Sequence, residues 1–512
     1  MKKIYFSLML MGTLAFTSCS MDQTPYGSLD DKTAIRDVND LGDFRNQLYS
    51  NMRSVTSGAW LYRPDIQMDE FHGLISNANR EGVFSTGQLI PSSTEIESFW
   101  LSGYTVIANC NAVLEHAATL SNTEGLSAEN KVLINRYSAE AHFVRAYMYF
   151  WMADHFCQSY TQTDPDKAAS GMPLTTTYNP SGDVSTYPSR STLNETYTFI
   201  ENDLKEALAG LQAYEASGAK DVATLDAPNA SYISSYAVQA LQARVALVKG
   251  DWTTAASCAE AVINSNKYEL TTIADYAKLW TNDEGTEVIY RPFMSNTELG
   301  GSNGAEYISD SETTCDYIPT FGLIGLYAEN DVRFSAFFKV YDNLQVEGSA
   351  YQSYVLNKFP GNEALRTSSK NNIMNMSKPF RLSEMYLIAA EAEARQNHVE
   401  TASNYLNTFL KNRLDGYRES TYASASSILP VIKEEREKEF VGEGMRMSDI
   451  RRYGEGFERY ADHEENEELN AIVVKLGKNL KYAKDDYRLT WPIPKAELDA
   501  NTNLAGQQNP GY

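Results

Sequence analysis

Hydrophobic and polar positions alternate at helical spacing along most of the chain. Between 139 and 156 the apolar residues fall at offsets of zero, three, four and seven, which place them on one face of an α-helix. The same offsets recur between 382 and 389. Further amphipathic stretches cover 193–211, 231–248 and 251–268. The pattern predicts a mainly all-α fold.

Short connectors between these stretches predict paired helices. Lys249, Gly250 and Asp251 form one such turn, and alanines on both sides of it allow two helices to approach closely. The arrangement resembles tetratricopeptide repeats, which are helix–turn–helix units, although the repeats here are degenerate. The predicted pairs are 99–120 with 131–156, 193–212 with 231–249, 251–265 with 380–396, and 400–414 with 427–445.

Two long insertions interrupt the helical scaffold, one at 54–98 and one that splits the third pair. Both are rich in Gly, Ser, Asn, Thr and aromatic residues. Long loops inside a compact domain often carry function, so 58–64 and 290–317 are the predicted binding surface. Minor β-strands are also expected, since 282–286 has the composition of a turn and 287–290 that of a short strand.

The start of the chain has the pattern of an export signal. Met-Lys-Lys precedes an apolar stretch, Ile4–Phe16, which small residues and Cys19 follow. The stretch is shorter than the roughly 20 residues of a membrane-spanning helix. A cysteine at the cleavage point resembles the bacterial lipoprotein signal, and the alternative is an ordinary signal with a coincidental cysteine. We predict a signal peptide over 1–18 and a lipid anchor at Cys19, which would hold the exported chain at the membrane.

Composition and charge exclude some partners. The chain has 512 residues, of which 43% are hydrophobic and 22% charged, as in ordinary globular proteins. Its formal net charge of −23 disfavours nucleic acid and anionic lipid, because phosphates would be repelled. Tyrosine is abundant, with 33 residues, and its ring and hydroxyl suit both sugar binding and packing between helices.

Catalysis and cofactors have little support in the sequence. A charged run contains Glu435 and Glu439 one helical turn apart, and paired carboxylates can act as acid and base. Cations are interleaved, however, and Arg436, Arg446 and Arg452 are available to pair, so we predict a solvated face or a structural ion-pair network. No nucleophile elbow, nucleotide-binding loop or EF-hand spacing is present. We therefore predict a protein that is not an enzyme and has no cofactor.

Cysteine and histidine spacings also argue against a metal site. Beyond the signal, the cysteines are Cys110, Cys157, Cys258 and Cys315. Their spacings are wide, so buried free thiols are expected, although disulfides stay an alternative in an exported chain. The six histidines lack zinc-binding spacing, and His142 and His155 are expected to pack within one helix.

Ordered motifs along the chain resemble one family. The C-terminal motifs are Phe380–Arg395, Leu406–Asn407, Arg413, Ile432–Tyr453, Trp491–Leu498, Asn501 and Gln508–Tyr512. Earlier motifs are Trp100–Leu114, Arg145–Tyr149, Gly171–Leu174, Arg190 and Asp331–Arg333. Together with the lipoprotein signal they resemble the SusD/RagB family of outer-membrane nutrient-binding lipoproteins. Tyr453, Met445 and Met447 depart from the family's more common residues at positions that bear on packing.

The resemblance implies a function and partners. It implies one SusD-like domain over 19–512, with an N-terminal part of about 22–215 and a C-terminal part of about 270–512. The helical body would act as a scaffold that docks on a SusC-like TonB-dependent transporter at the cell surface. The loops would hold a ligand, most often an oligosaccharide and in some members a peptide. A surface protein-interaction scaffold is the rival interpretation, and a surface hydrolase comes third.

A sugar site needs aromatic faces for the apolar side of the ring and planar polar groups for its hydroxyls. The candidate residues are Trp60, Tyr62, Arg63, Arg80, Trp280, Tyr290, Tyr307 and Tyr317. Packing in the core is the alternative for each of them. Trp280 stands beside a helix-like run, which favours the core, whereas Trp60 and Tyr62 stand between Gly58 and Pro64 in an expected loop.

Overall fold

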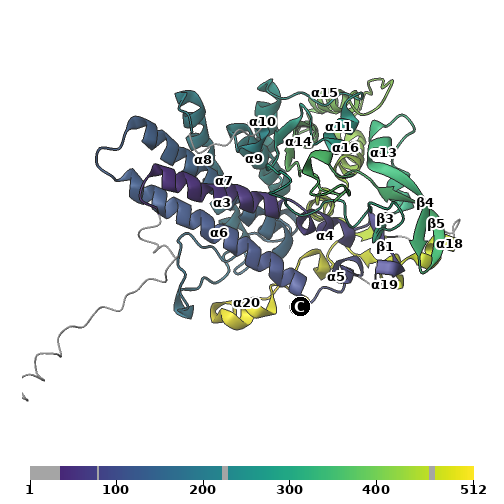
Figure 1. Cartoon of the computed structure of the whole chain (residues 1–512), viewed down its shortest axis with the longest axis horizontal. Coiled ribbons are helices and arrows are strands. Elements are labelled where there is room, and N and C mark those ends of the chain that lie inside the picture. The colour runs from purple at the N-terminus through teal and green to yellow at the C-terminus, as the bar shows by residue number, and fades with distance from the viewer. Residues whose placement is uncertain (1–34, 78–79, 222–228, 460–466) are drawn as a thin grey trace, which may run out of the picture.

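The computed structural model describes residues 35–77, 80–221, 229–459 and 467–512, and most of them are helical (Figure 1). The predicted signal peptide and Cys19 lie outside the described residues. None of the described helices is both long and apolar enough to cross a membrane.

The N-terminal half is a layer of long helices. These are α3 (Val38–Val55), α6 (Thr94–Ser121), α7 (Ala128–Phe156) and α8 (Leu193–Ser217). The first helix packs on α6 and α7, and α7 also packs on α6 and α8 (Figure 1). Thr192 begins α8 with a capping box, in which Glu195 reaches back to the cap backbone.

The predicted helix pairs are confirmed. Further helices of the scaffold are α9 (Ser235–Lys249), α10 (Trp252–Asn264), α14 (Leu382–Arg395), α15 (Val399–Leu410) and α16 (Ala425–Phe440). Contacts join α6 to α7, α8 to α9, α10 to α14, and α15 to α16. The α9–α10 turn is the predicted one. Gly250 there has φ of 75° and ends α9 in the left-handed conformation that glycine adopts readily.

Short helices and strands make up the insertions and the C-terminal region. The short helices are α4 (Ala59–Gln67), α5 (Gly82–Ser85), α11 (Tyr276–Thr281), α12 (Phe321–Ile324), α13 (Val332–Phe337), α17 (Arg446–Tyr453), α18 (Glu467–Ile472), α19 (Lys475–Lys478) and α20 (Lys495–Ala500). The 3₁₀ helices are η1 (Ile75–Asn77), η2 (Tyr160–Gln162), η3 (Val184–Thr186), η4 (Asn229–Ser231), η5 (Glu363–Leu365), η6 (Tyr487–Leu489) and η7 (Thr502–Leu504).

The strands form small antiparallel ribbons. They are β1 (Phe71–Gly73), β2 (Val288–Tyr290), β3 (Tyr317–Pro319), β4 (Phe338–Val346), β5 (Ser349–Leu356), β6 (Phe380–Arg381), β7 (Phe457–Glu458) and β8 (Lys481–Tyr482). They pair as β1–β3, β2–β6, β4–β5 and β7–β8. The β1–β3 pair joins the two insertions, with Gly73 opposite Tyr317.

The predicted strand near 287–290 is confirmed as β2, but the predicted loop at 58–64 is wrong. This segment forms most of α4, which begins after Gly58 at φ of 59°. A Cβ at Gly58 would lie 3.0 Å from the backbone of Gly301, so the residue is suited both to the conformation and to the close approach. Pro64 lies inside this helix, where its ring removes the backbone N–H that would otherwise donate to the carbonyl of Trp60.

The charged run on α16 is a structural ion-pair network, as one of the two predictions had it. The carboxylate of Glu439 accepts from Arg381 at 2.7 Å and from Arg413 at 3.0 Å, and Arg333 pairs with Glu435 at 2.6 Å. Burial alone would raise the pKa of Glu439, but Arg413 and Arg381 outweigh it and lower that pKa strongly. These three arginines come from other segments of the chain. The arginines that the sequence suggested are also paired: Arg446 with Glu437 of the run at 2.8 Å, and Arg436 and Arg452 with Asp449 at 2.9 and 2.8 Å.

The cysteines and histidines agree with the expectations in part. All four cysteines beyond Cys19 are free thiols in the structure, and three of them are buried, whereas Cys258 is half-buried. His155 is buried and stacks on Trp151 with ring centroids 4.0 Å apart, and burial lowers its pKa to about 3. The Nδ1 atom of His142 forms a hydrogen bond of 2.6 Å with the carboxylate of Asp203 on the neighbouring helix.

Candidate ligand-binding site

Five of the six predicted aromatic residues lie in the hydrophobic core. Their rings have at most 9% of their surface exposed, so they offer no open face on which a sugar could stack. They are Trp60, Trp280, Tyr290, Tyr307 and Tyr317. This placement corrects the sequence-based assignment: long aromatic-rich insertions here fill space against the helical body.

Trp280 shows why the insertion rings are buried. Phe337 meets it edge to face at 5.5 Å, and the ammonium of Lys358 lies 4.4 Å from its ring centroid. Arg381, a member of the ion-pair network, lies 5.1 Å from the same ring. Cations over an aromatic face are attracted to it, most strongly where both are away from water. Trp280 is therefore part of the core and covers buried charge.

The other three predicted residues lie together near the surface. Arg63 donates twice to Glu81, at 2.7 and 2.9 Å, and the Tyr62 hydroxyl donates to the same carboxylate at 3.2 Å. Arg80 pairs with Asp316 at 2.7 Å and has 61% of its side chain exposed. The polar atoms of Tyr62 and Arg63 are thus engaged within the protein, and Arg80 is the most accessible of the predicted residues.

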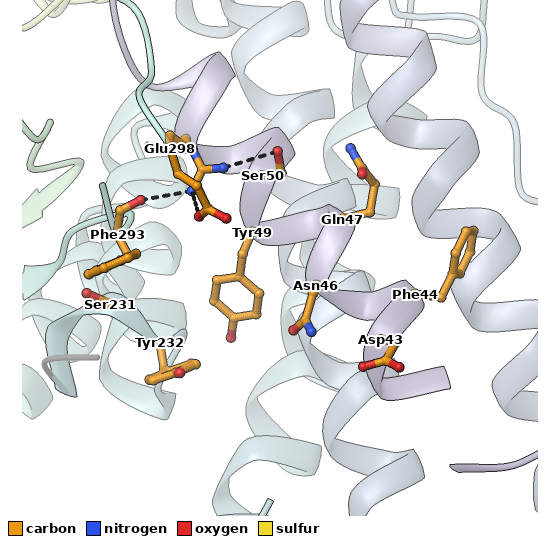
Figure 2. Close-up of a pocket in the computed structure, with 11 residues that line it drawn as sticks. Asp43, Phe44, Asn46, Gln47, Tyr49, Ser50, Ser231, Tyr232, Phe293 and Glu298 are labelled. Carbon is orange, nitrogen blue, oxygen red and sulfur yellow. Dashed lines mark hydrogen bonds and ion pairs between the residues drawn. The ribbon is translucent and has the colours of Figure 1, made fainter. Parts of the chain in front are cut away.

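A cavity of about 490 Å³ lies along α3, away from these residues (Figure 2). It is lined by Asp43, Phe44, Asn46, Gln47, Tyr49, Ser50, Arg53, Ser231, Tyr232, Phe293 and Glu298. Figure 2 shows Tyr49 and Tyr232 near one another, with Phe293 and Glu298 beyond them. The wall therefore combines aromatic rings with amide, hydroxyl and charged groups.

The aromatic wall is held in a fixed orientation. Tyr49 and Tyr232 meet edge to face with centroids 5.7 Å apart. The Tyr49 hydroxyl donates to Glu140 at 2.8 Å and accepts from the backbone N–H of Ile233 at 3.3 Å. Burial and the neighbouring Glu140 raise the pKa of Tyr49 well above its ordinary value. Tyr49 is therefore neutral at physiological pH and presents ring surface to the cavity.

Arg53 joins α3 to the second insertion at the cavity rim. Its Nη1 donates to the carbonyl of Phe293 and to the carboxylate of Glu298, each at 3.1 Å. Arg53 thereby fixes the insertion segment that carries both residues. Among the described residues, no partner satisfies the buried Oγ of Ser231, another wall residue. A buried hydroxyl without a partner costs free energy.

A buried ion-pair network supports the wall from behind. Arg45 on α3 pairs with Glu140 at 3.1 Å and also with Asp221. Arg136 pairs with Glu140 at 3.0 Å and with Asp221 at 2.9 Å. Two guanidinium groups thus neutralise two carboxylates and connect α3, α7 and the segment after α8. Since Tyr49 donates into this network, its position depends on buried groups as well as on packing.

The cavity fits a neutral polyol better than an anion. Its two carboxylates, Asp43 and Glu298, disfavour anions, and the one wall cation, Arg53, is already paired. Aromatic faces can cover the apolar side of a sugar ring, while Asn46 and Ser231 offer groups that bond hydroxyls. Sequence reasoning missed these residues, apart from placing Phe293 and Glu298 in the predicted 290–317 surface.

Comparison with known proteins agrees with the fold and the motifs. Residues 328–512 match a family model described as the SusD family, and residues 32–247 match one described as starch-binding and associating with the outer membrane. The chain belongs to the SusD/RagB family. A SusD-like protein P2 from Formosa agariphila is 25% identical to it over the whole chain and 99% of that protein.

Solved structures have the same SusD fold. A SusD superfamily protein from Bacteroides thetaiotaomicron aligns with a TM-score of 0.76 and 25% identity, over 93% of this chain and all of that one. A putative sugar-binding protein from Bacteroides vulgatus aligns with a TM-score of 0.74 and 24% identity, over 94% of this chain and all of that one. The surface glycan-binding protein A from Bacteroides fluxus gives 0.66 and 20% identity, over 93% and 99%. These likenesses confirm the tetratricopeptide-like helical fold.

Proposed function

We propose that this SusD-family chain is a cell-surface lipoprotein that captures a neutral oligosaccharide and delivers it to a SusC-like TonB-dependent transporter. The observation that carries the proposal is the cavity on α3, where aromatic rings and polar groups form one wall. Two solved proteins of the same fold are described as sugar-binding or glycan-binding, which supports this ligand class.

In this proposal the cavity binds its ligand without breaking a bond. Tyr232 and Phe293 would cover the apolar face of a sugar ring, and Ser231 and Asn46 would bond its hydroxyls. The position of Arg53 between the helix and the insertion would keep that wall in place. A preformed wall of this kind spares the ligand the free-energy cost of ordering the site.

The anchor and the transporter complete the proposed role. Acylation at Cys19 would keep the chain beside one transporter, so that capture and delivery occur at high local concentration. The matched family description, association with the outer membrane, agrees with such a location. Energy for movement would come from the transporter, since the sequence has no nucleotide-binding loop.

Isothermal titration calorimetry tests ligand capture directly. Maltoheptaose, cellohexaose and mannohexaose serve as neutral probes, and we expect at least one to bind. Tyr232→Ala should weaken that binding about tenfold, because a stacking face is lost. Phe321→Ala is the matched control, since Phe321 is an exposed ring, 38% accessible, outside the cavity. Binding of none of the three probes would refute the proposal.

Co-purification from the outer membrane tests the partner. Recovery of a TonB-dependent transporter with the tagged chain would support delivery, and a Cys19→Ser variant should lose both the anchor and the co-purification. Recovery of soluble proteins alone would favour the interaction-scaffold alternative. Binding of peptides in place of the three oligosaccharides would favour the peptide-importing alternative.

A further inference from the structure

A second, more polar cavity of about 350 Å³ lies where the C-terminal segment meets the residues after α7. It is lined by Gln158, Ser159, Gln162, Arg451, Lys484, Asp485, Asp486, Tyr487, Leu489, Thr490 and Pro510. None of these residues lines the cavity on α3. The two cavities are therefore separate places at which a ligand could bind.

Tyr487 gives the second cavity an exposed aromatic face. The residue is 45% exposed, unlike the aromatic candidates in the core. Gly511 covers one side of its ring: a Cβ built at Gly511 would lie only 2.3 Å from the ring carbon Cγ. Gly511 also has φ of 95°, which other residues rarely adopt. A ring covered by backbone on one side and open on the other is a suitable platform for a sugar.

The platform is also fixed from its edge. The Tyr512 ring meets Tyr487 at 4.9 Å and an interplanar angle of 80°. The Tyr512 hydroxyl donates to the carbonyl of Thr490 at 3.1 Å, which holds the chain end in place. The last two residues thus orient Tyr487 without contributing a charged side chain to the cavity. A preoriented ring loses little conformational entropy when a ligand stacks on it.

Arg451 supports the same cavity from behind. Its side chain is only 3% exposed, and its Nη1 lies 3.6 Å from the carboxylate of Asp154. Its other terminal nitrogen donates to the carbonyl of Cys157. The charge of Arg451 is therefore compensated within the protein, and the residue holds in place the segment after α7 that carries Gln158.

The remaining wall favours a neutral ligand rich in hydroxyls. Gln158 and Gln162 supply side-chain amides, which can donate to a hydroxyl and accept from it. Asp486 is neutralised by Arg488, whose Nε and Nη2 donate to it at 2.9 and 2.6 Å. Asp485 and Lys484 balance each other in formal charge. A polyanion gains no net attraction here. Gln158 accepts from Thr163 at 3.0 Å and Gln162 donates to Thr161 at 3.2 Å, and each amide keeps further hydrogen-bonding capacity for a ligand hydroxyl.

We infer that this cavity is a second carbohydrate-binding subsite, in which Tyr487 stacks on a neutral sugar ring and Gln158 and Gln162 bond its hydroxyls. The inference rests on the proposed function, since it assumes that the ligand is a glycan. It adds that a long glycan can contact the protein at two places. Two linked contacts raise the apparent affinity for a polymer above that of either subsite alone.

Calorimetric stoichiometry with a short probe tests the inference. Maltotriose, cellotriose and mannotriose serve as probes because a short glycan is expected to occupy one cavity at a time. The full-length chain should bind one of them at two sites. Tyr487→Ala should leave only one site, whereas Tyr487→Phe, which keeps the ring, should leave both. Gln158→Ala gives a second test that does not touch the packing of Gly511 and Tyr512, and it should weaken one of the two sites about tenfold.

The outcomes separate this inference from the proposed function. If the wild-type chain binds at one site only, and Tyr232→Ala weakens this site while Tyr487→Ala leaves it unchanged, the second subsite is overturned. That result would support the cavity on α3 as the binding site. Two sites, one of them lost in Tyr487→Ala, would support the inference. Absence of binding by every short and long probe would overturn both. Affinity electrophoresis in soluble starch provides the polymer test, in which Tyr487→Ala should migrate faster than Phe321→Ala.

Discussion

The Tyr49 hydroxyl donates to Glu140 at 2.8 Å, and this bond links the wall of the α3 cavity to charges buried beneath it. Glu140 in turn pairs with Arg45 and Arg136. The cavity wall is therefore an extension of the scaffold's ion-pair network. The same groups support both the binding surface and the stability of the fold. Substitutions that change only the wall, or only the network beneath it, can therefore separate the two effects.

Tyr49→Phe should lower stability and leave ligand affinity unchanged. The substitution keeps the ring in the wall but removes the bond to Glu140 and the acceptor for the N–H of Ile233. An unsatisfied buried group costs about 1 to 3 kcal/mol, so urea denaturation should show a loss of this size. Calorimetry with maltoheptaose checks the affinity. A Tyr49→Phe variant with wild-type stability, or with weaker binding of maltoheptaose, would contradict this account.

Arg53→Ala should weaken ligand binding about tenfold, because it removes the charged hydrogen bonds that fix the insertion segment. Glu298→Gln is the matched comparison. Since the Glu298 side chain is 54% exposed, its pair with Arg53 contributes less than about 1 kcal/mol to stability. Arg53 also keeps the Phe293 carbonyl as a partner in that variant, so its affinity should stay near wild type. Equal losses of affinity in both variants would show that the Arg53–Glu298 ion pair orders the rim, and not the hydrogen bond from Arg53 to the Phe293 carbonyl.

Asp449→Asn should reveal an acid-dependent contribution to stability. Burial would raise the pKa of Asp449, but Arg436 and Arg452 outweigh it and lower the pKa to about 2. Because the folded-state pKa lies below the unfolded one, the carboxylate stabilises the fold above pH 4, and this contribution disappears as pH falls toward 2. The variant should be about 2 to 3 kcal/mol less stable at neutral pH.

Urea denaturation of wild type and Asp449→Asn across this pH range checks the sign. The difference between them should narrow as the solution becomes more acidic, since the wild-type carboxyl then becomes neutral like the amide. The comparison cancels other titrating groups that the two chains share. A gap that stayed constant or widened on acidification would show that Asp449 is not held charged by the two arginines.

Most of the helical scaffold was predictable because each helix carries its own apolar periodicity. The exception is α3, which was not predicted although Leu41, Leu48 and Met52 lie on its buried face. Arg45 lies in the middle of that face, so the sequence of the face is not continuously apolar. Its partners, Glu140 and Asp221, are far away in sequence. Because residues far away in sequence neutralise this buried charge, the sequence alone predicted neither α3 nor the cavity that α3 lines.

The candidate site was harder to predict for a related reason. Aromatic residues in a polar insertion have the same local sequence whether they face solvent or the core. Trp280 is buried because Phe337 and Lys358 cover it, and neither is a neighbour in sequence. Tyr487 is 45% exposed although Gly511 and Tyr512, which are not its neighbours in sequence, pack against it. Only the tertiary contacts distinguish these two rings.

Trp280→Ala tests the corrected role of a predicted residue that lies in the core. With only 1% of its surface exposed, its removal leaves a cavity and uncovers Lys358 and Arg381, so stability should fall by about 3 to 5 kcal/mol. Arg80→Ala is the comparison, because Arg80 is exposed and should change stability by less than about 1 kcal/mol. Where Trp280→Ala fails to fold, Trp280→Phe should show a smaller loss in the same direction. Unchanged stability with lost glycan binding in the Trp280 variants would instead restore the platform role, since a ring that binds only ligand contributes nothing to the free protein.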